Sequence, residues 1–398
     1  MKKYLLLIAA ALVVVGCEKK DEGPKELPKP QKEKEKEKEN EKPSSKVAKT
    51  QMEVDMGGAN EPYQVYVDLA TKQITKVRRD AWDIAFYCGD DFRVIINPAI
   101  AMTVTATTRN INEFVHTVPS ILLNGDPTLP SQVLISSHIV DDPRGRLSPS
   151  VDKNTGEMLS GTGTAIAEIA VNDVDNKVYL LNLGSNISTK TPEIGSVDLI
   201  GSDRGWMKVQ IMRRGNAYRM LYANNYVTAD TKGEKIEEVT IDKNPLYNFI
   251  FFSLHDKKIV QVQPPKTNWD LCFTAATSWF STDEEKILSP QNSVTFFPDL
   301  VVTNLHGGTK ATLYDTSTTP YETYSKEKTK KINFNNERYN TQMAIGRNWR
   351  DNQVGNLVRD ELFAVVRDSE GRYYKLKFLR LKDDKGERGY PAFEYEEL

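Results

Sequence analysis

Few residues of the types that perform chemistry occur in this chain of 398 residues. It holds four His, three Cys and nine Met, against 17 Tyr and 14 Phe. Serine-nucleophile, zinc-protease, phosphate-loop and dinucleotide-binding motifs are all missing from the sequence. The adjacent pairs Asp90-Asp91 and Asp141-Asp142 would point to opposite faces of a strand, or serve as ordinary turn residues. The sequence therefore gives no support for an enzyme, and we predict a protein that is not one.

Cys17 is the cysteine whose surroundings indicate a defined modification. Lys2 and Lys3 are followed by an apolar run over 4–15, and Gly16 precedes the cysteine. This run is too short to cross a bilayer core of ~30 Å as a helix, so 1–16 is predicted to be a signal peptide. The pattern resembles the lipobox of bacterial lipoproteins, in which the cysteine is lipidated and anchors the protein to the membrane. The alternative is an ordinary secretory signal with an accidental cysteine.

Residues 17–50 are predicted to be the lipidated cysteine and a disordered, charged linker. Lys and Glu alternate strictly over 32–39, which places like charges four residues apart and opposes a helix. As a flexible coil the linker would reach about 30 Å. Acidic residues directly behind Cys17 resemble the surface-export signal of Bacteroidota lipoproteins. We therefore expect an outer-membrane protein at the cell surface, with the periplasmic face as the alternative.

The composition of the chain favours β-structure and excludes a nucleic-acid-binding function. The net charge of −2 leaves no excess of basic residues with which to cover phosphates. The length fits roughly two domains of about 150 residues each. Only Cys88 and Cys272 remain after Cys17, so one disulfide is the most that could form, and we expect both to be small buried hydrophobic residues.

Two stretches of the folded part repeat one pattern. In each, a strand ends in Leu, Ile follows five residues later, Val three residues after that, and a Trp-Asp strand comes next; the copies are 69–86 and 254–273. A hairpin is predicted late in each half, over 209–222 and 363–379. The fold class is therefore predicted to be all-β, with two tandem antiparallel domains behind a disordered tether.

The domain boundary is placed near residue 242, where a turn sequence precedes the second copy. This gives a first domain over 51–241 and a second over 242–398. We expect 242–398 to fold as a separate unit.

Several segments resemble the HmuY family of haem-binding lipoproteins of Bacteroidota. They are 269–273 (Trp-Asp-Leu-Cys-Phe), 302–304 (Val-Thr-Asn) followed by Gly307-Gly308, 371–378 and 389–395. The resemblance covers 245–398 well, and 55–240 more weakly through 82–86 (Trp-Asp-Ile-Ala-Phe) and Ile96-Asn97. It implies a pocket between projecting loops that holds one haem, which then passes to a TonB-dependent outer-membrane receptor.

The resemblance also implies which residues hold the iron. Family members use two axial side chains, either two His or two Met, and both types ligate haem iron. Met343 is the best candidate here and His306 the next, against a core methionine and a turn histidine as the alternatives. Trp349 falls near the second ligand position; Trp cannot ligate iron, so we assign it to the pocket wall.

Two functional hypotheses follow. In the first, the lipoprotein captures haem, free or from a haemoprotein, without turnover. In the second, the same β-scaffold has lost haem ligation and binds a protein or glycan at the cell surface, a reading that Trp349 and the scarcity of His favour.

Overall fold

The computed structural model describes residues 48–107, 110–113, 133–134, 139–159, 162–224, 235–279, 293–334, 336, 339–351 and 357–398. These residues belong to one compact unit, Val47–Leu398. The predicted signal peptide, Cys17 and most of the linker lie outside the described residues.

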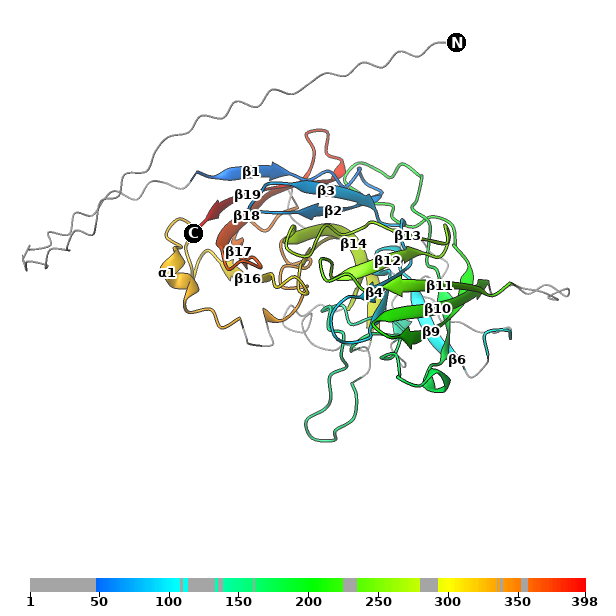
Figure 1. The fold of residues 1–398 in the computed structure, drawn as a ribbon. Helices are drawn as coiled ribbons and strands as arrows, with labels where there is room; N and C mark the ends of the chain where they lie inside the picture. Colours follow the sequence, from blue (N-terminus) through cyan, green and yellow to red (C-terminus); the bar gives the residue numbers. More distant parts are fainter. Residues whose placement is uncertain are drawn as a thin grey trace, which may run out of the picture. The chain divides into compact units, whose positions relative to one another are not determined.

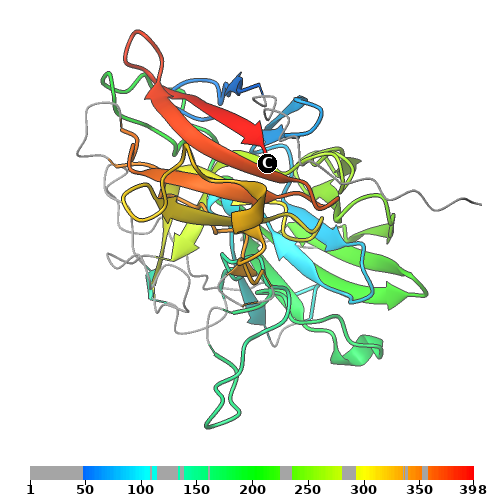
Figure 2. The ribbon, with the colours of Figure 1, turned by 90° about the vertical axis from the view of Figure 1, so that its left-hand side faces the viewer.

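Antiparallel β-strands make up almost all of the regular secondary structure of the described residues, in four sheets (Figure 1, Figure 2). Sheet A has the order β1-β19-β18-β17-β16 and contains β1 (Thr50–Glu53), β16 (Lys310–Asp315), β17 (Leu362–Arg367), β18 (Tyr373–Lys382) and β19 (Arg388–Glu397). Sheet D has the order β11-β10-β9-β8-β6 and contains β6 (Thr103–Thr107), β8 (Val178–Asn182), β9 (Trp206–Arg214), β10 (Ala217–Asn224) and β11 (Glu237–Asp242). The prediction of an all-β fold is confirmed.

Sheets B and C each combine several strands from both halves of the chain, and sheet A does so through β1. Sheet C has the order β13-β12-β4-β5 and contains β4 (Ile84–Tyr87), β5 (Val94–Ile96), β12 (Phe249–Ser253) and β13 (Lys258–Val260). Sheet B has the order β3-β2-β14-β15-β7 and contains β2 (Tyr63–Val67), β3 (Ile74–Arg78), β7 (Val133–Leu134), β14 (Leu271–Trp279) and β15 (Ser293–Thr303). The boundary near residue 242 therefore separates strands that share sheets, which argues against our expectation that 242–398 folds alone.

The hairpins predicted late in each half are present. β9 and β10 pair so that Arg214 faces Ala217, which leaves Gly215 and Asn216 as a two-residue turn. Gly215 has φ +59°, a left-handed conformation that glycine adopts without strain. β17 and β18 form the second hairpin with a longer loop. The β-strand patterns of the sequence thus specify these local pairings.

Helical segments are short. They are η1 (Pro98–Ile100), η2 (Asp173–Asp175) and α1 (Lys326–Thr329). Within the described ranges no helix has the length and apolar character needed to span a membrane.

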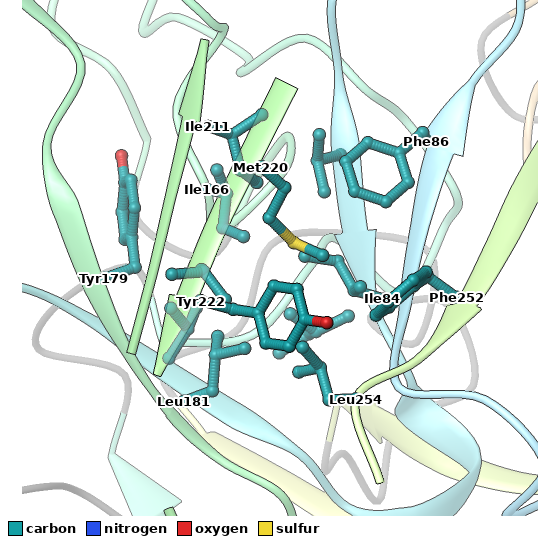
Figure 3. Packing of buried hydrophobic residues seen from close by; sticks show 14 of the residues in the cluster. Ile84, Phe86, Ile166, Tyr179, Leu181, Ile211, Met220, Tyr222, Phe252 and Leu254 are labelled. Atoms are coloured by element: carbon teal, nitrogen blue, oxygen red, sulfur yellow. The ribbon is translucent and has the colours of Figure 1, made fainter. Parts of the chain in front are cut away.

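The two largest hydrophobic clusters each lie between two sheets. One packs strands of sheet D against β4, with Ile84, Phe86, Met220 and Tyr222 among its residues (Figure 3). The other packs sheet A against sheet B, with Phe378 and Phe393 at its centre. A smaller cluster lies where sheets B and C meet, and it contains both Trp residues of the repeated Trp-Asp motif, Trp82 and Trp269.

Candidate functional site

A cavity opens beside the small cluster of Trp82 and Trp269. Its empty volume is about 1090 Å³, counting the part open to solvent. Its walls are mostly apolar with a few polar groups among them, which is the usual lining of a ligand pocket. Two edge-to-face aromatic pairs line it: Trp82 with Phe251 at 4.8 Å between ring centroids, and Trp269 with Tyr66 at 5.0 Å.

His306 lies on the wall of this cavity, in the loop between β15 and β16. Asn304 holds the loop, because its side-chain oxygen accepts the Gly307 amide (2.9 Å) and its side-chain nitrogen donates to the Trp269 carbonyl (2.8 Å). A Cβ atom on Gly307 would come within 2.3 Å of the Lys266 carbonyl oxygen, so only glycine fits there. The motif Asn-Leu-His-Gly-Gly over 304–308 therefore fixes the position of the His306 imidazole.

The imidazole of His306 is held neutral by its surroundings. Its ring lies edge-on to Phe249 at 5.3 Å and 5.5 Å from the ring of Tyr87. Burial lowers the pKa of His306 to about 4, while a hydrogen bond with the Gly145 backbone partly opposes the shift. A neutral imidazole is the form that ligates a metal. His306 is thus a partly buried cavity residue instead of an exposed turn histidine.

Met343 lines the same cavity from a different segment. Its side chain is 3% exposed and packs with Ala276, Phe297 and Leu300. The segment is held in place because the Gln342 carbonyl accepts the Thr303 amide (2.9 Å), and the Gln342 amide donates to the Arg144 carbonyl (2.8 Å). The structure therefore brings both sequence-predicted ligand candidates, Met343 and His306, to one cavity. The same packing also suits a core methionine.

Trp349 does not line this cavity, and its assignment to the pocket wall is corrected accordingly. The indole is 1% exposed and lies 4.4 Å from the ring of Phe378, between sheets A and B. Its Nε1–H donates to the Asp299 carbonyl oxygen at 3.0 Å. The large apolar ring and its satisfied N–H make Trp349 a core residue.

Cys88, Cys272 and His255 lie in different surroundings. Cys272 is buried on the cavity wall and Cys88 is partly buried, and both are free thiols. His255 is exposed and contacts Asp256. His116 and His138 lie outside the described residues.

Sequence reasoning missed most of the cavity wall, including a partly buried carboxyl group. Asp141 lies on the wall, and its two oxygens accept the backbone amides of Ile96 and Ala165, each at 2.8 Å. Burial raises the pKa of Asp141 to about 7. Its neighbour Asp142 instead forms a buried ion pair with Arg144 at 2.7 Å. The pair looked like ordinary turn residues because adjacent Asp residues carry no signal of burial.

Asp141→Asn is expected to remove part of the pH dependence of stability. The pKa of the Asp141 carboxyl group is about 7 in the folded state and near 4 in the unfolded state. The group therefore stabilises the fold fully below pH ~4. This contribution is lost as pH rises through 7, by at most about 4 kcal/mol. The free energy of unfolding, measured by urea denaturation at several pH values, should fall more steeply between pH 4 and 8 in the parent than in the variant. Parallel curves would contradict the assignment.

No group of three or more His, Cys, Asp or Glu that could hold a metal ion occurs among the described residues. The cavity instead offers one imidazole (His306), two thioethers (Met102 and Met343) and aromatic walls, which are the kinds of groups that contact haem.

Comparison with known families is decisive for the classification. The family model described as HmuY protein matches the chain twice, over residues 60–236 and 246–395. The chain belongs to the HmuY family. It carries two HmuY regions in tandem, and each contains one Trp-Asp strand. Each edge-to-face pair of the cavity takes one ring from each HmuY region. No curated protein and no solved structure matches the chain.

Proposed function

We propose that this tandem HmuY protein is a lipid-anchored outer-membrane protein that captures haem at the cell surface and delivers it to a TonB-dependent receptor. HmuY is a haem-binding, non-enzymatic family, which supports binding without turnover. The observation that carries the proposal is that His306 and Met343 share one cavity with aromatic walls. Haem would supply the iron, and these two side chains are its candidate protein ligands.

The residues of this chain would contribute in distinct ways. His306 offers a neutral nitrogen over the physiological pH range, because its pKa is about 4. Met343 offers a thioether, which binds haem iron in many cytochromes. The rings of Trp82, Trp269 and Phe251 present apolar surface to a flat macrocycle.

A haem titration tests this proposal. The chain from residue 18 onward, which lacks the signal peptide and Cys17, is titrated with haemin, and the Soret band is recorded. A red-shifted, sharpened band that saturates is expected. An unchanged band would reject haem capture.

The second candidate function is that of a surface protein that binds a protein or glycan without haem. Trp349 favours it, because this residue falls near the expected second ligand position, is packed in the core and cannot ligate iron. An unshifted Soret band, together with retention of the chain on a surface glycan or protein array, would support this second function.

Lipid anchoring forms part of the proposal and rests on Cys17. Cys17→Ala should abolish incorporation of a fatty-acid analogue, because no other thiol lies near the predicted cleavage site. Metabolic labelling of cells that express either form is the measurement. A Cys88→Ala variant is the control and should be labelled like the parent. Label that persists on Cys17→Ala would contradict anchoring at this residue.

A further inference from the structure

The first hairpin of each HmuY region pairs with the other region. The hairpin β12–β13 of the second region pairs through β12 with β4 of the first, with Phe252 opposite Ile84. The hairpin β2–β3 of the first region pairs through β2 with β14 of the second, with Val67 opposite Leu271. The two regions therefore exchange equivalent hairpins reciprocally.

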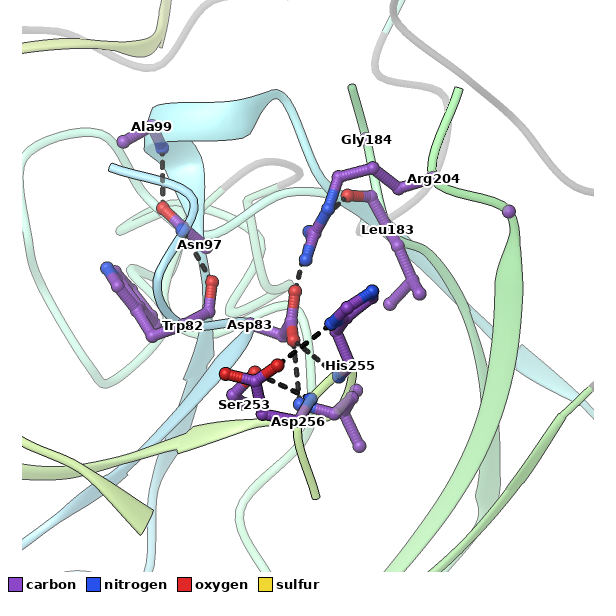
Figure 4. Close-up of polar contacts among 12 residues, drawn as sticks. Trp82, Asp83, Asn97, Ala99, Leu183, Gly184, Arg204, Ser253, His255 and Asp256 are labelled. Carbon is purple, nitrogen blue, oxygen red and sulfur yellow. Dashed lines mark hydrogen bonds and ion pairs between the residues drawn. The ribbon is translucent and has the colours of Figure 1, made fainter. Parts of the chain in front are cut away.

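The repeated Trp-Asp motif fastens each exchanged hairpin. The side chain of Asp83, whose polar contacts Figure 4 shows, accepts the Leu254 amide at 2.7 Å. The side chain of Asp270 accepts the Leu69 amide at 2.9 Å. Leu254 and Leu69 are the equivalent Leu residues just after the first strand of each copy, β12 and β2. Each Asp thus binds the end of the first strand that comes from the other region.

The backbone repeats this relation. The Asp83 amide donates to the Phe252 carbonyl (3.0 Å), and the Asp270 amide donates to the Val67 carbonyl (2.8 Å). Within each region an Asn holds the Trp-Asp turn: Asn97 donates to the Trp82 carbonyl (2.7 Å), as Asn304 does to that of Trp269. Both copies of the Trp-Asp motif therefore hold the exchanged hairpins through the same set of bonds.

The exchanged strands also complete the hydrophobic cores. Phe252 and Leu254 of β12 and the turn after it belong to the cluster that packs against sheet D, which the first region builds. Val65 and Val67 of β2 belong to the cluster between sheets A and B, and most of the other residues of this cluster come from the second region. Since successive residues of a strand face opposite sides, the neighbouring residues Phe251 and Tyr66 face the small cluster beside the cavity.

We propose that the two HmuY regions form one inseparable folding unit and that the cavity is a single shared binding site per chain, which neither region possesses alone. Without the second region, β4 would lack the hairpin β12–β13. Without the first region, β14 would lack the hairpin β2–β3. Removing either region would also expose an unpaired apolar strand edge and remove one ring from each aromatic pair. A two-stranded hairpin on its own is marginally stable in water, so neither hairpin would compensate for the loss.

A chain that can be cut between the regions tests this proposal without using haem. A protease site is inserted after Pro245, an exposed residue between the two matched regions, in the chain from residue 18 onward. After cleavage, urea is raised, and strand content by circular dichroism and particle size by gel filtration are followed together. The same chain without the insertion, treated with the protease, is the control.

The expected result is that the cut chain elutes as one particle in buffer, and that the halves separate at the same urea concentration at which strand content is lost. Separation into folded halves before strand content falls would overturn the proposal. Separation in buffer alone would do so as well. Neither result depends on whether the protein binds haem.

Discussion

Asp83→Asn is expected to lower the free energy of unfolding by about 3–5 kcal/mol, because it breaks a buried ion pair by removing one partner. Arg204 contacts Asp83 at 2.6 Å, and the two side chains are 6% and 0% exposed. An Asn that accepts the Leu254 amide through its oxygen would turn its NH₂ group towards this guanidinium. The variant would leave a buried positive charge facing another donor.

Asp270→Asn is the matched control at the equivalent position of the second region. The partner of its other oxygen is the Thr309 hydroxyl at 3.1 Å, which can accept from an amide as readily as it donates to a carboxylate. Burial also raises the pKa of Asp270 to about 6, so the neutral Asn replaces a carboxylate that is costly to ionise. We expect a loss of about 1 kcal/mol or less.

Urea unfolding of the chain from residue 18 onward, followed by circular dichroism at pH 7, gives both values. In a single folding unit, Asp83→Asn should shift the whole transition and leave no separate transition for the second region. Equal losses for the two variants would contradict the role given to Arg204.

Met343→Ala is expected to abolish or strongly shift the Soret band of the haem-bound chain. Met343 would hold the iron through its thioether, so its loss should change both the spectrum and the affinity. The substitution also leaves a hole, which typically costs about 2–5 kcal/mol at a buried methionine. A control is therefore needed for the effect of the hole.

Met220→Ala provides that control, because Met220 is buried in the cluster against sheet D and does not line the cavity. It should lower stability by a similar amount and leave the Soret band unchanged. His306→Ala should change the band without a large loss of stability, since His306 is only partly buried. If Met343→Ala binds haem with an unaltered spectrum, Met343 is a core residue and not a ligand.

Local structure could be predicted from the sequence where the signal is local. Alternation in Tyr63–Val67 and the Gly215-Asn216 turn predict a strand and a hairpin that the structure contains. The two copies of the Trp-Asp pattern predict the duplication, which the two family matches confirm. Each of these inferences depends on residues close together in the chain.

The exchange between regions could not be predicted in this way. β2 and β12 are each followed closely by a Leu, and β4 and β14 begin after the same Trp-Asp pair, so either pairing satisfies the pattern. Packing between residues far apart in the sequence selects the exchanged pairing. The periodicity of apolar residues carries no information about such packing. The expectation that 242–398 folds independently rested only on the domain boundary predicted near residue 242.

The candidate site was predictable only in part. His306 and Met343 were found because imidazole and thioether are recognisable ligand types, and the structure places both on one cavity. Trp349 was assigned to the wall from its position in the sequence, yet its ring fills the core between sheets A and B. Asp141 was passed over because nothing in the sequence shows that its carboxyl group lies on the cavity wall. The neighbouring Asp142 instead forms an ion pair with Arg144.

The number of haem molecules bound per chain tests the central claim most directly, because that claim is one cavity shared by two HmuY regions. A Soret titration of the chain from residue 18 onward, at protein concentrations well above the dissociation constant, gives this number from its equivalence point. The account predicts an equivalence point at one haem per chain. An equivalence point at two, one for each HmuY region, or a Soret band that does not shift, would contradict it.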